Sequence, residues 1–349
     1  MTSTEDSVKE LDPKNVELLG KFVSDIRYGK LQGNLKIALT TVSFLEQLIS
    51  ESQNATAYEL CSMLRAVGWR ICRTLPHEIV PANMVRRVLR AIRDENRAQA
   101  NQSAEVASES LQRLVLGAPS RRATVGPAEQ DLREPIRDQI AELRAELEST
   151  FSSISSQSRA HIGRGEVVLC AGSCALLEGF LRAAPPHRAL VAGGDRLRES
   201  HAMAARLSTA GLSVTVISNA AIFAVMSRVN KVVFTVRAAL GGGSVLAAPG
   251  INMLTSAAKF YNVPVLALAP LYSLMPLHAA DPQDTALTSP LLTHDYRHSD
   301  SDVTHVYAPM HDFLPPDQIT MFITNLGGSS PSYIYRLLSE LYDSRDNEL

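Results

Sequence analysis

The sequence contains few cysteines, few aromatic residues and no excess of either charge. Its 349 residues include four cysteines and one tryptophan, and aromatic side chains make up 5%. So few cysteines in so long a chain do not suggest a disulfide framework, which favours a reducing compartment, the cytosol. Because 34 basic residues are balanced by 36 acidic ones, the basic excess typical of nucleic-acid-binding proteins is missing.

Long apolar runs and an N-terminal targeting signal are missing as well. No apolar segment reaches the ~18 residues that a membrane-spanning helix needs. The first residues, MTSTEDSVKELD, are acidic and polar, unlike a secretory or mitochondrial signal. We therefore expect no association with a membrane. The length and the 45% content of hydrophobic residues suffice for two domains with buried cores.

Hydrophobic periodicity divides the chain into a helical part and an α/β part. In residues 1–97 apolar side chains recur at spacings of three and four, which predicts an N-terminal helical domain, a bundle of short helices. Residues 98–128 are small and polar and predict a flexible insertion, and residues 129–162 predict a long connecting helix. In residues 163–349 strand-like and helix-like segments alternate. This pattern predicts an α/β fold, a Rossmann-like parallel sheet with helices on both faces.

One helix-length segment, residues 219–231 (NAAIFAVMSRVNK), has almost no polar face. It includes seven consecutive apolar residues, whereas a helix beside water shows a polar stripe. We therefore expect this helix to be buried on all sides, in a domain core or partly against another chain.

Several motifs that could carry chemistry have simpler structural explanations. Cys170 and Cys174 lack further ligands for zinc nearby, so we expect two small buried thiols. The glycine-rich residues 241–244 and 325–330 fit either a phosphate-binding loop or an ordinary turn and helix cap, and turn chemistry is the favoured interpretation. Residues 294–305 contain three histidines in a polar loop with no element to fix their geometry. The sequence therefore predicts no metal site and no cofactor.

Two helices carry charges of opposite sign. The first is rich in arginine and the second in glutamate near its end: Arg86, Arg87, Arg90 and Arg93, against Glu142, Glu146 and Glu148. No aromatic residues alternate with the arginines, so nucleic-acid binding is not predicted. Solvated or partner-facing helices are the expected explanation for both clusters.

Four segments together resemble one protein family. They are residues 83–95 (NMVRRVLRAIRDE), 219–232 (NAAIFAVMSRVNKV), 313–328 (FLPPDQITMFITNLGG) and 330–342 (SPSYIYRLLSELY). They resemble the alpha, beta and delta regulatory subunits of the guanine-nucleotide exchange factor that recharges eukaryotic translation initiation factor 2. The second segment resembles the beta members in particular. The similarity extends in order over nearly the whole chain and is weakest around residues 98–127.

The resemblance implies a non-catalytic regulatory subunit in the cytosol. Its partners would be the delta and alpha subunits, and the gamma and epsilon subunits, which carry catalysis. The resemblance also implies that the assembly binds the alpha subunit of initiation factor 2 and senses its phosphorylation. The residues that we expect to bind partners are Glu142, Ile222, Phe223, Met226, Arg228, Asn230, Tyr333, Tyr335 and Arg336.

The resemblance also leaves an enzymatic alternative, a sugar-phosphate isomerase. Isomerases of methylthioribose-1-phosphate and ribose-1,5-bisphosphate share this fold and use a cysteine after the first strand and an aspartate in a GADR-like turn. These positions fall here on Ala171 and Arg237, with Cys170 one residue away, and a further acid–base pair falls on Gly193 and Asp195. Since a guanidinium cannot act as a base and neighbouring strand residues face opposite ways, we expect no isomerase activity. A sugar-phosphate or nucleotide sensor in the same crevice is a third interpretation.

Overall fold

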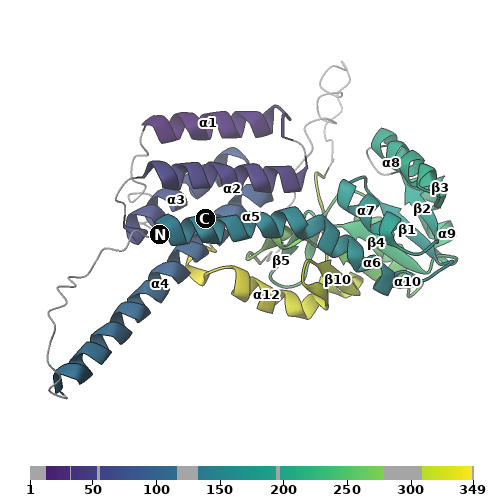
Figure 1. Ribbon diagram of the computed structural model, residues 1–349. Helices are drawn as coiled ribbons and strands as arrows, with labels where there is room; N and C mark the ends of the chain where they lie inside the picture. Colours follow the sequence, from purple (N-terminus) through teal and green to yellow (C-terminus); the bar gives the residue numbers. More distant parts are fainter. Residues whose placement is uncertain are drawn as a thin grey trace. The chain divides into compact units, whose positions relative to one another are not determined.

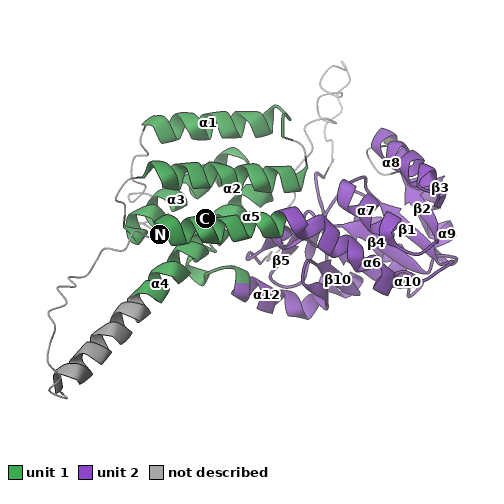
Figure 2. Cartoon of the chain, in the orientation of Figure 1, with its two compact units in different colours: residues 1–147, 341–349 green, residues 148–340 purple. Residues whose placement is uncertain are grey.

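The computed structural model describes residues 13–31, 33–52, 56–115, 133–193, 197–278 and 309–347 (Figure 1). The chain forms two compact units (Figure 2). Unit 1 comprises residues 1–147 and 341–349, and unit 2 comprises residues 148–340. None of the helices in the described ranges combines the length and the apolar character needed to cross a bilayer.

Unit 1 is a bundle of helices around an aliphatic core. The helices are α1 (Pro13–Arg27), α2 (Asn34–Glu51), α3 (Ala57–Thr74), α4 (Ile79–Val115) and the first part of α5 (Arg133–Ser156). A capping box begins α3, because Glu59 N donates to Thr56 Oγ1 (3.3 Å) and Thr56 N donates to Glu59 Oε2 (3.0 Å). Leu45, Leu64 and Leu89 are fully buried at the predicted spacing.

Helix α4 continues beyond residue 97, into the segment that we expected to be a flexible insertion. The helix ends only at Val115, because residues 98–115 contain neither glycine nor proline, the two residues that interrupt helices. The remainder of the expected insertion lies outside the described residues. Within the described part of residues 129–162, for which we expected one long connecting helix, the structure has α5, ending at Ser156, followed by the single turn α6 (Ser158–His161).

Unit 2 is built on a seven-stranded sheet. The strands are β1 (Val167–Ala171), β2 (Arg188–Ala192), β3 (Ser213–Ile217), β4 (Lys231–Thr235), β7 (Val265–Leu268), β10 (Met321–Thr324) and β11 (Gly327–Ser329). Their order is β11-β10-β7-β4-β1-β2-β3, and all neighbours are parallel except β10 and β11. This is the α/β fold that the alternation of strands and helices predicts.

Helices connect the parallel strands. They are α7 (Ala175–Ala183), α8 (Leu197–Thr209), α9 (Ile222–Met226) and α10 (Ile251–Phe260). One core cluster joins α7 and α8 to alternate residues of the sheet, such as Val168, Val191 and Val233. In the strand order, the connection from β1 leads to β2 on one side, whereas the connection from β4 leads to β7 on the other side. Since such crossovers are right-handed, α7 and α10 cover opposite faces.

A small second sheet in unit 2 has the order β8-β5-β6-β9. Its strands are β5 (Ala238–Leu240), β6 (Val245–Ala247), β8 (Leu274–Met275) and β9 (Asp312–Leu314). Between β5 and β6, residues 241–244 form a hairpin turn in which Leu240 N donates to Ser244 O (2.9 Å). Gly243 has a φ of 79°, which only glycine adopts readily. The glycine-rich residues 241–244 therefore form a turn, the interpretation that the sequence favours.

The apolar segment 219–231 is shorter and less buried than expected. It forms a 3-10 turn (η1, Asn219–Ala221) and the five-residue helix α9. Ile222 and Met226 are buried, but Phe223 and Ala224 are exposed. Helix α9 lies beside α10 and presents its other side to solvent, so the expectation of burial on all sides is wrong for this chain alone.

The last described residues belong to unit 1, whereas the sequence assigned all of residues 163–349 to the α/β domain. Helix α12 (Ile334–Leu341) begins in unit 2, and its final residue begins a tail that includes a one-turn helix, η6 (Ser344–Asp346). Unit 1 is therefore made from both ends of the chain.

Candidate functional sites

The carboxyl ends of β1 and β4 lie where the strand order reverses. Strand β1 pairs with β2 on one side and with β4 on the other. In open α/β sheets this switch point is where small molecules bind, so it is the place to look for isomerase chemistry. Ala171 ends β1, and Arg237 follows β4 by two residues.

Cys170, the thiol closest in sequence to the isomerase position, is part of the core. Its side chain is fully buried in the cluster shared with α7 and α8, and its Sγ lies 3.4 Å from Leu190 O. Burial raises the pKa of this thiol to about 12. A group with this pKa and no access to solvent does not transfer protons to a substrate near neutral pH. Cys170 is therefore the buried structural thiol that the sequence predicts.

Cys174 has a structural role of a different kind, as the N-cap of α7. Its Sγ accepts a hydrogen bond from Leu177 N (3.4 Å) and donates one to Thr235 Oγ1 (3.5 Å). Burial raises the pKa of this thiol too, which keeps it protonated. This cap could not be predicted from the sequence, because cysteine is not among the usual N-cap residues.

The two described positions among the other isomerase groups, 193 and 237, do not supply a base. Arg237 occupies the place of the aspartate, Gly193 has no side chain, and Asp195 lies outside the described residues. A guanidinium donates hydrogen bonds and stays charged, so it cannot accept the proton that isomerisation removes. In the part of the chain that the structure describes, no three metal-ligating side chains gather. The histidines of residues 294–305 fall outside that part.

An exposed apolar patch, made by Ala220, Phe223, Met253 and Phe260, lies over α9 and α10. Phe223 is 51% exposed and Phe260 69% exposed, and their ring centroids are 5.3 Å apart. The patch lines an open groove of about 370 Å³. Phe223 and Phe260 therefore form an exposed apolar surface on this side of unit 2.

The other expected contact residues near α9 have different surroundings. Ile222 and Met226 are buried within unit 2, and Arg228 is exposed. The Asn230 side chain holds the start of β1, because its Oδ1 accepts from Val167 N (2.8 Å). Asn230 therefore supports the sheet.

The expected contact residues of α12 and its first turn are exposed. Tyr333 and Tyr335 are 39% and 65% exposed. The Arg336 guanidinium stacks over the Tyr333 ring at 5.6 Å and donates from Nε to Glu340 Oε1 (3.1 Å). Tyr333 lines a second groove of about 430 Å³, which shares no lining residue with the first. Glu142 is exposed on α5 in unit 1, so the expected contact residues belong to several surfaces.

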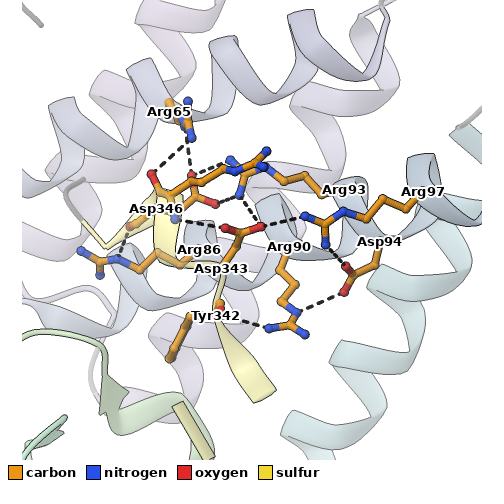
Figure 3. Close-up of polar contacts among 10 residues, drawn as sticks. Arg65, Arg86, Arg90, Arg93, Asp94, Arg97, Tyr342, Asp343 and Asp346 are labelled. Carbon is orange, nitrogen blue, oxygen red and sulfur yellow. Dashed lines mark hydrogen bonds and ion pairs between the residues drawn. The ribbon is translucent and has the colours of Figure 1, made fainter. Parts of the chain in front are cut away.

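An arginine cluster of α3 and α4 in unit 1 holds the C-terminal tail (Figure 3). The Asp346 carboxylate, 0% exposed, accepts from Arg65 Nε (2.9 Å) and from Arg93 Nη2 (2.7 Å), and Arg93 Nη1 also contacts it. Burial alone would lower the pKa of Arg93, but the hydrogen bonds and the charge of Asp346 raise it. Asp343 lies 3.5 Å from Arg93 Nη1 and 3.4 Å from Arg97 Nη2.

Arginines of this cluster also bind main-chain carbonyl groups of the tail. Arg90 Nη1 donates to Tyr342 O (2.9 Å), and Arg65 Nη2 donates to Arg345 O (3.3 Å). Arg86 Nε donates to Asp346 O (3.0 Å), and its Nη2 donates to Asn347 O (3.3 Å). Arg86 is only 1% exposed, and burial lowers its pKa.

The interpretation of this arginine-rich helix as solvated or partner-facing is therefore wrong for most of its arginines. Arg87 is also used within unit 1, where it makes two parallel hydrogen bonds to the Glu146 carboxylate, of 2.8 and 2.6 Å. Two sequence patterns agree with the docking of the tail, but neither of them identifies the tail as the ligand. The arginines at 86, 90, 93 and 97 share one helix face, and Asp343 and Asp346 are spaced by three, as on one helical turn.

Comparisons with known proteins agree with the resemblance of the four sequence segments. The family model described as "Initiation factor 2 subunit family" matches residues 30–331. The beta subunit of translation initiation factor eIF2B from Schizosaccharomyces pombe is 31% identical over 381 residues, covering 95% of this chain and 97% of that protein. The chain belongs to the initiation factor 2 subunit family.

Solved structures show the fold of this initiation factor 2 subunit family member in other proteins. The crystal structure of eIF2B beta from Chaetomium thermophilum has a TM-score of 0.72 at 23% identity, over 100% of this chain and 98% of that one. A chain of the tetrameric eIF2B-beta2-delta2 complex from C. thermophilum has a TM-score of 0.71 at 22% identity, over 98% of this chain and 100% of that one. The fold is therefore shared over nearly the whole length.

Proposed function

We propose that this chain is a beta-type regulatory subunit of eIF2B, the guanine-nucleotide exchange factor for initiation factor 2, and that it has no catalytic activity of its own. The observation that carries this proposal is the match to S. pombe eIF2B beta over 95% of the chain. The carboxyl ends of β1 and β4 support it, because Ala171 and Arg237 occupy the positions of the thiol and the carboxylate of the related isomerases. The neighbouring Cys170 thiol is buried. The subunit would act in the cytosol, through contacts with other subunits.

The delta subunit is the first partner that we propose. A C. thermophilum relative of the same fold is described in a beta2-delta2 complex. The apolar patch of Phe223 and Phe260 supports a lasting contact, since subunit interfaces of this kind are apolar at their centres. We propose that the patch is part of the surface that pairs with delta, with Arg228 at its rim. The buried Ile222 and Met226 would position Phe223 from the interior of unit 2, and Asn230 would hold the start of β1.

Substitution of Phe223 tests the pairing. Phe223→Ser removes an exposed ring, so the chain itself should remain folded. We expect the variant to lose at least ~10-fold in affinity for a delta subunit, as is usual for an aromatic anchor at the centre of an interface. The measurement is co-purification with tagged delta, followed by a binding titration.

Tyr58→Ser is the matched control, because Tyr58 is an exposed aromatic residue, 80% exposed, on α3. It should bind delta like the wild-type chain. Equal affinity of the Phe223→Ser variant and the wild type would remove the patch from the delta interface. A wild-type chain without affinity for delta would overturn the proposed function itself.

We further propose that the exposed Glu142 on α5 helps to bind the alpha subunit of initiation factor 2, and that the assembled core senses phosphorylation of that subunit. Tyr333, Tyr335 and Arg336 are proposed to contact another subunit of the complex, which also contains alpha, gamma and epsilon. Glu142→Lys should slow nucleotide exchange by the reconstituted complex, whereas Glu17→Lys on the exposed side of α1 should not. Unchanged exchange in the Glu142→Lys complex would refute the role of Glu142.

A further inference from the structure

The C-terminal tail, residues 342–347, is held mainly by polar contacts. Tyr342 and Asp346 are its buried side chains, whereas Ser344 and Arg345 are exposed. Its secondary structure is the single turn η6. So short a turn is not stable alone, and its conformation depends on the surface to which it binds.

The contacts of the tail are of the kind by which a protein binds a short peptide. Arginines of α3 and α4 bind two tail carboxylates and four main-chain carbonyl groups, those of Tyr342, Arg345, Asp346 and Asn347. The Tyr342 side chain provides an aromatic anchor that is 3% exposed. Arginine suits this use, because its planar group donates several hydrogen bonds in fixed directions and stays charged.

Without the tail, two arginine side chains of α4 would lose most of their hydrogen-bond and ion-pair partners. The buried Arg86 would keep Asn83 (3.3 Å) but would lose both of its carbonyl partners in the tail. Arg93, 12% exposed, would lose the carboxylates of Asp343 and Asp346. Removing the partners of buried charges is strongly destabilising, because the remaining charges have no compensating group.

We propose that the arginine cluster is a peptide-binding site of the helical unit and that its ligand is the chain's own C-terminal segment. The recognised ligand class is an acidic peptide with a tyrosine followed by aspartates at the first and fourth positions after it. Because these residues follow unit 2 in the sequence, unit 1 is complete only when residues 341–347 are present. A chain that ends before residue 341 would have an unfinished helical unit.

Hydrogen exchange of the full-length chain tests the proposal. Asp346→Asn removes the buried carboxylate charge and keeps the size of the side chain. We expect amides of residues 342–347, and those of α4 around Arg86 and Arg93, to exchange ~100-fold faster in this variant. The matched control is Asp25→Asn on α1, because Asp25 pairs with Lys30 in an exposed pair outside the arginine cluster, where a pair contributes little.

A peptide experiment tests recognition separately. A chain that ends at residue 340 is mixed with a synthetic peptide of residues 341–349, and binding is measured by fluorescence anisotropy. We expect binding of this peptide and at least ~10-fold weaker binding of the same peptide with both Asp343→Asn and Asp346→Asn. Equal binding of the two peptides would refute recognition of the carboxylates. Similar exchange rates in the Asp346→Asn and Asp25→Asn variants would refute the proposal even if the shortened chain does not fold.

Discussion

The ion pair between Arg87 on α4 and Glu146 on α5 gives the sharpest prediction for stability. The two side chains are 13% and 29% exposed and share two hydrogen bonds of 2.8 and 2.6 Å. Burial alone would lower the pKa of Arg87, but the hydrogen bonds and the charge of Glu146 raise it. Glu146→Gln keeps the shape of the side chain and leaves the Arg87 charge without its counterion.

The loss in free energy of unfolding that we expect for Glu146→Gln lies between two known limits. Breaking an exposed pair costs ~0.2–1 kcal/mol, and removing one partner of a fully buried pair costs ~3–5 kcal/mol. Because Arg87 is mostly buried and Glu146 is partly exposed, we expect the free energy of unfolding of unit 1 to fall by ~2 kcal/mol. For a domain of this size that corresponds to a decrease of ~6 °C in its thermal midpoint.

Calorimetry and hydrogen exchange of the α4 amides measure this loss. The control is Glu142→Gln, one turn earlier on α5, where the exposed side chain should contribute less than ~0.5 kcal/mol. The double variant Arg87→Met with Glu146→Leu should lose less stability than Glu146→Gln alone, because it leaves no buried charge unpaired. The reasoning is refuted if Glu146→Gln and Glu142→Gln have equal effects, or if the double variant is the least stable.

Three further predictions concern unit 2. Phe180→Ala, in the core under α7, should lower the free energy of unfolding by ~3–5 kcal/mol in urea titrations. Asn230→Ala should cost ~1–2 kcal/mol and speed exchange of the Val167 amide, which loses its acceptor. Although burial would raise the pKa of Glu166, its hydrogen bonds from Lys231 and Gly163 N lower it. The resulting stabilisation is present above the unfolded pKa of ~4.3 and lost as pH falls through the lower folded value, so thermal midpoints of Glu166→Gln should approach those of the wild type at low pH.

The α/β fold could be predicted because its signals are local. Strands such as Val167–Ala171 and Val265–Leu268 are continuous apolar runs, as expected for parallel strands covered on both faces. The continuation of α4 was also visible in principle. The polar composition of residues 98–115 was interpreted as flexible, but glycine and proline are the residues that interrupt helices most strongly, and neither occurs in residues 98–116.

The docking of the tail could not be derived in the same way. Arg93 and Asp346 are 253 positions apart in the sequence, and periodicity contains no information about pairs so distant. The spacing of the arginines defines one face of a helix but does not say whether water, another chain or the same chain covers it. The exposure of Phe223 was missed for a related reason. A run of apolar residues does not reveal that the helix has only five residues and that one of its sides faces solvent.

The turn at Gly243 lies against the turn that leads into α12, and so connects the small sheet to that helix. A Cβ atom at this position would lie 2.6 Å from the carbonyl oxygen of Pro331, in the turn that leads into α12. The positive φ excludes most side chains for an independent reason. A substitution here would therefore push away the first turn before α12, and the disturbance would follow that helix to the chain's end. We would look for the damage of a Gly243 variant at the carboxyl terminus, about a hundred residues from the mutated position.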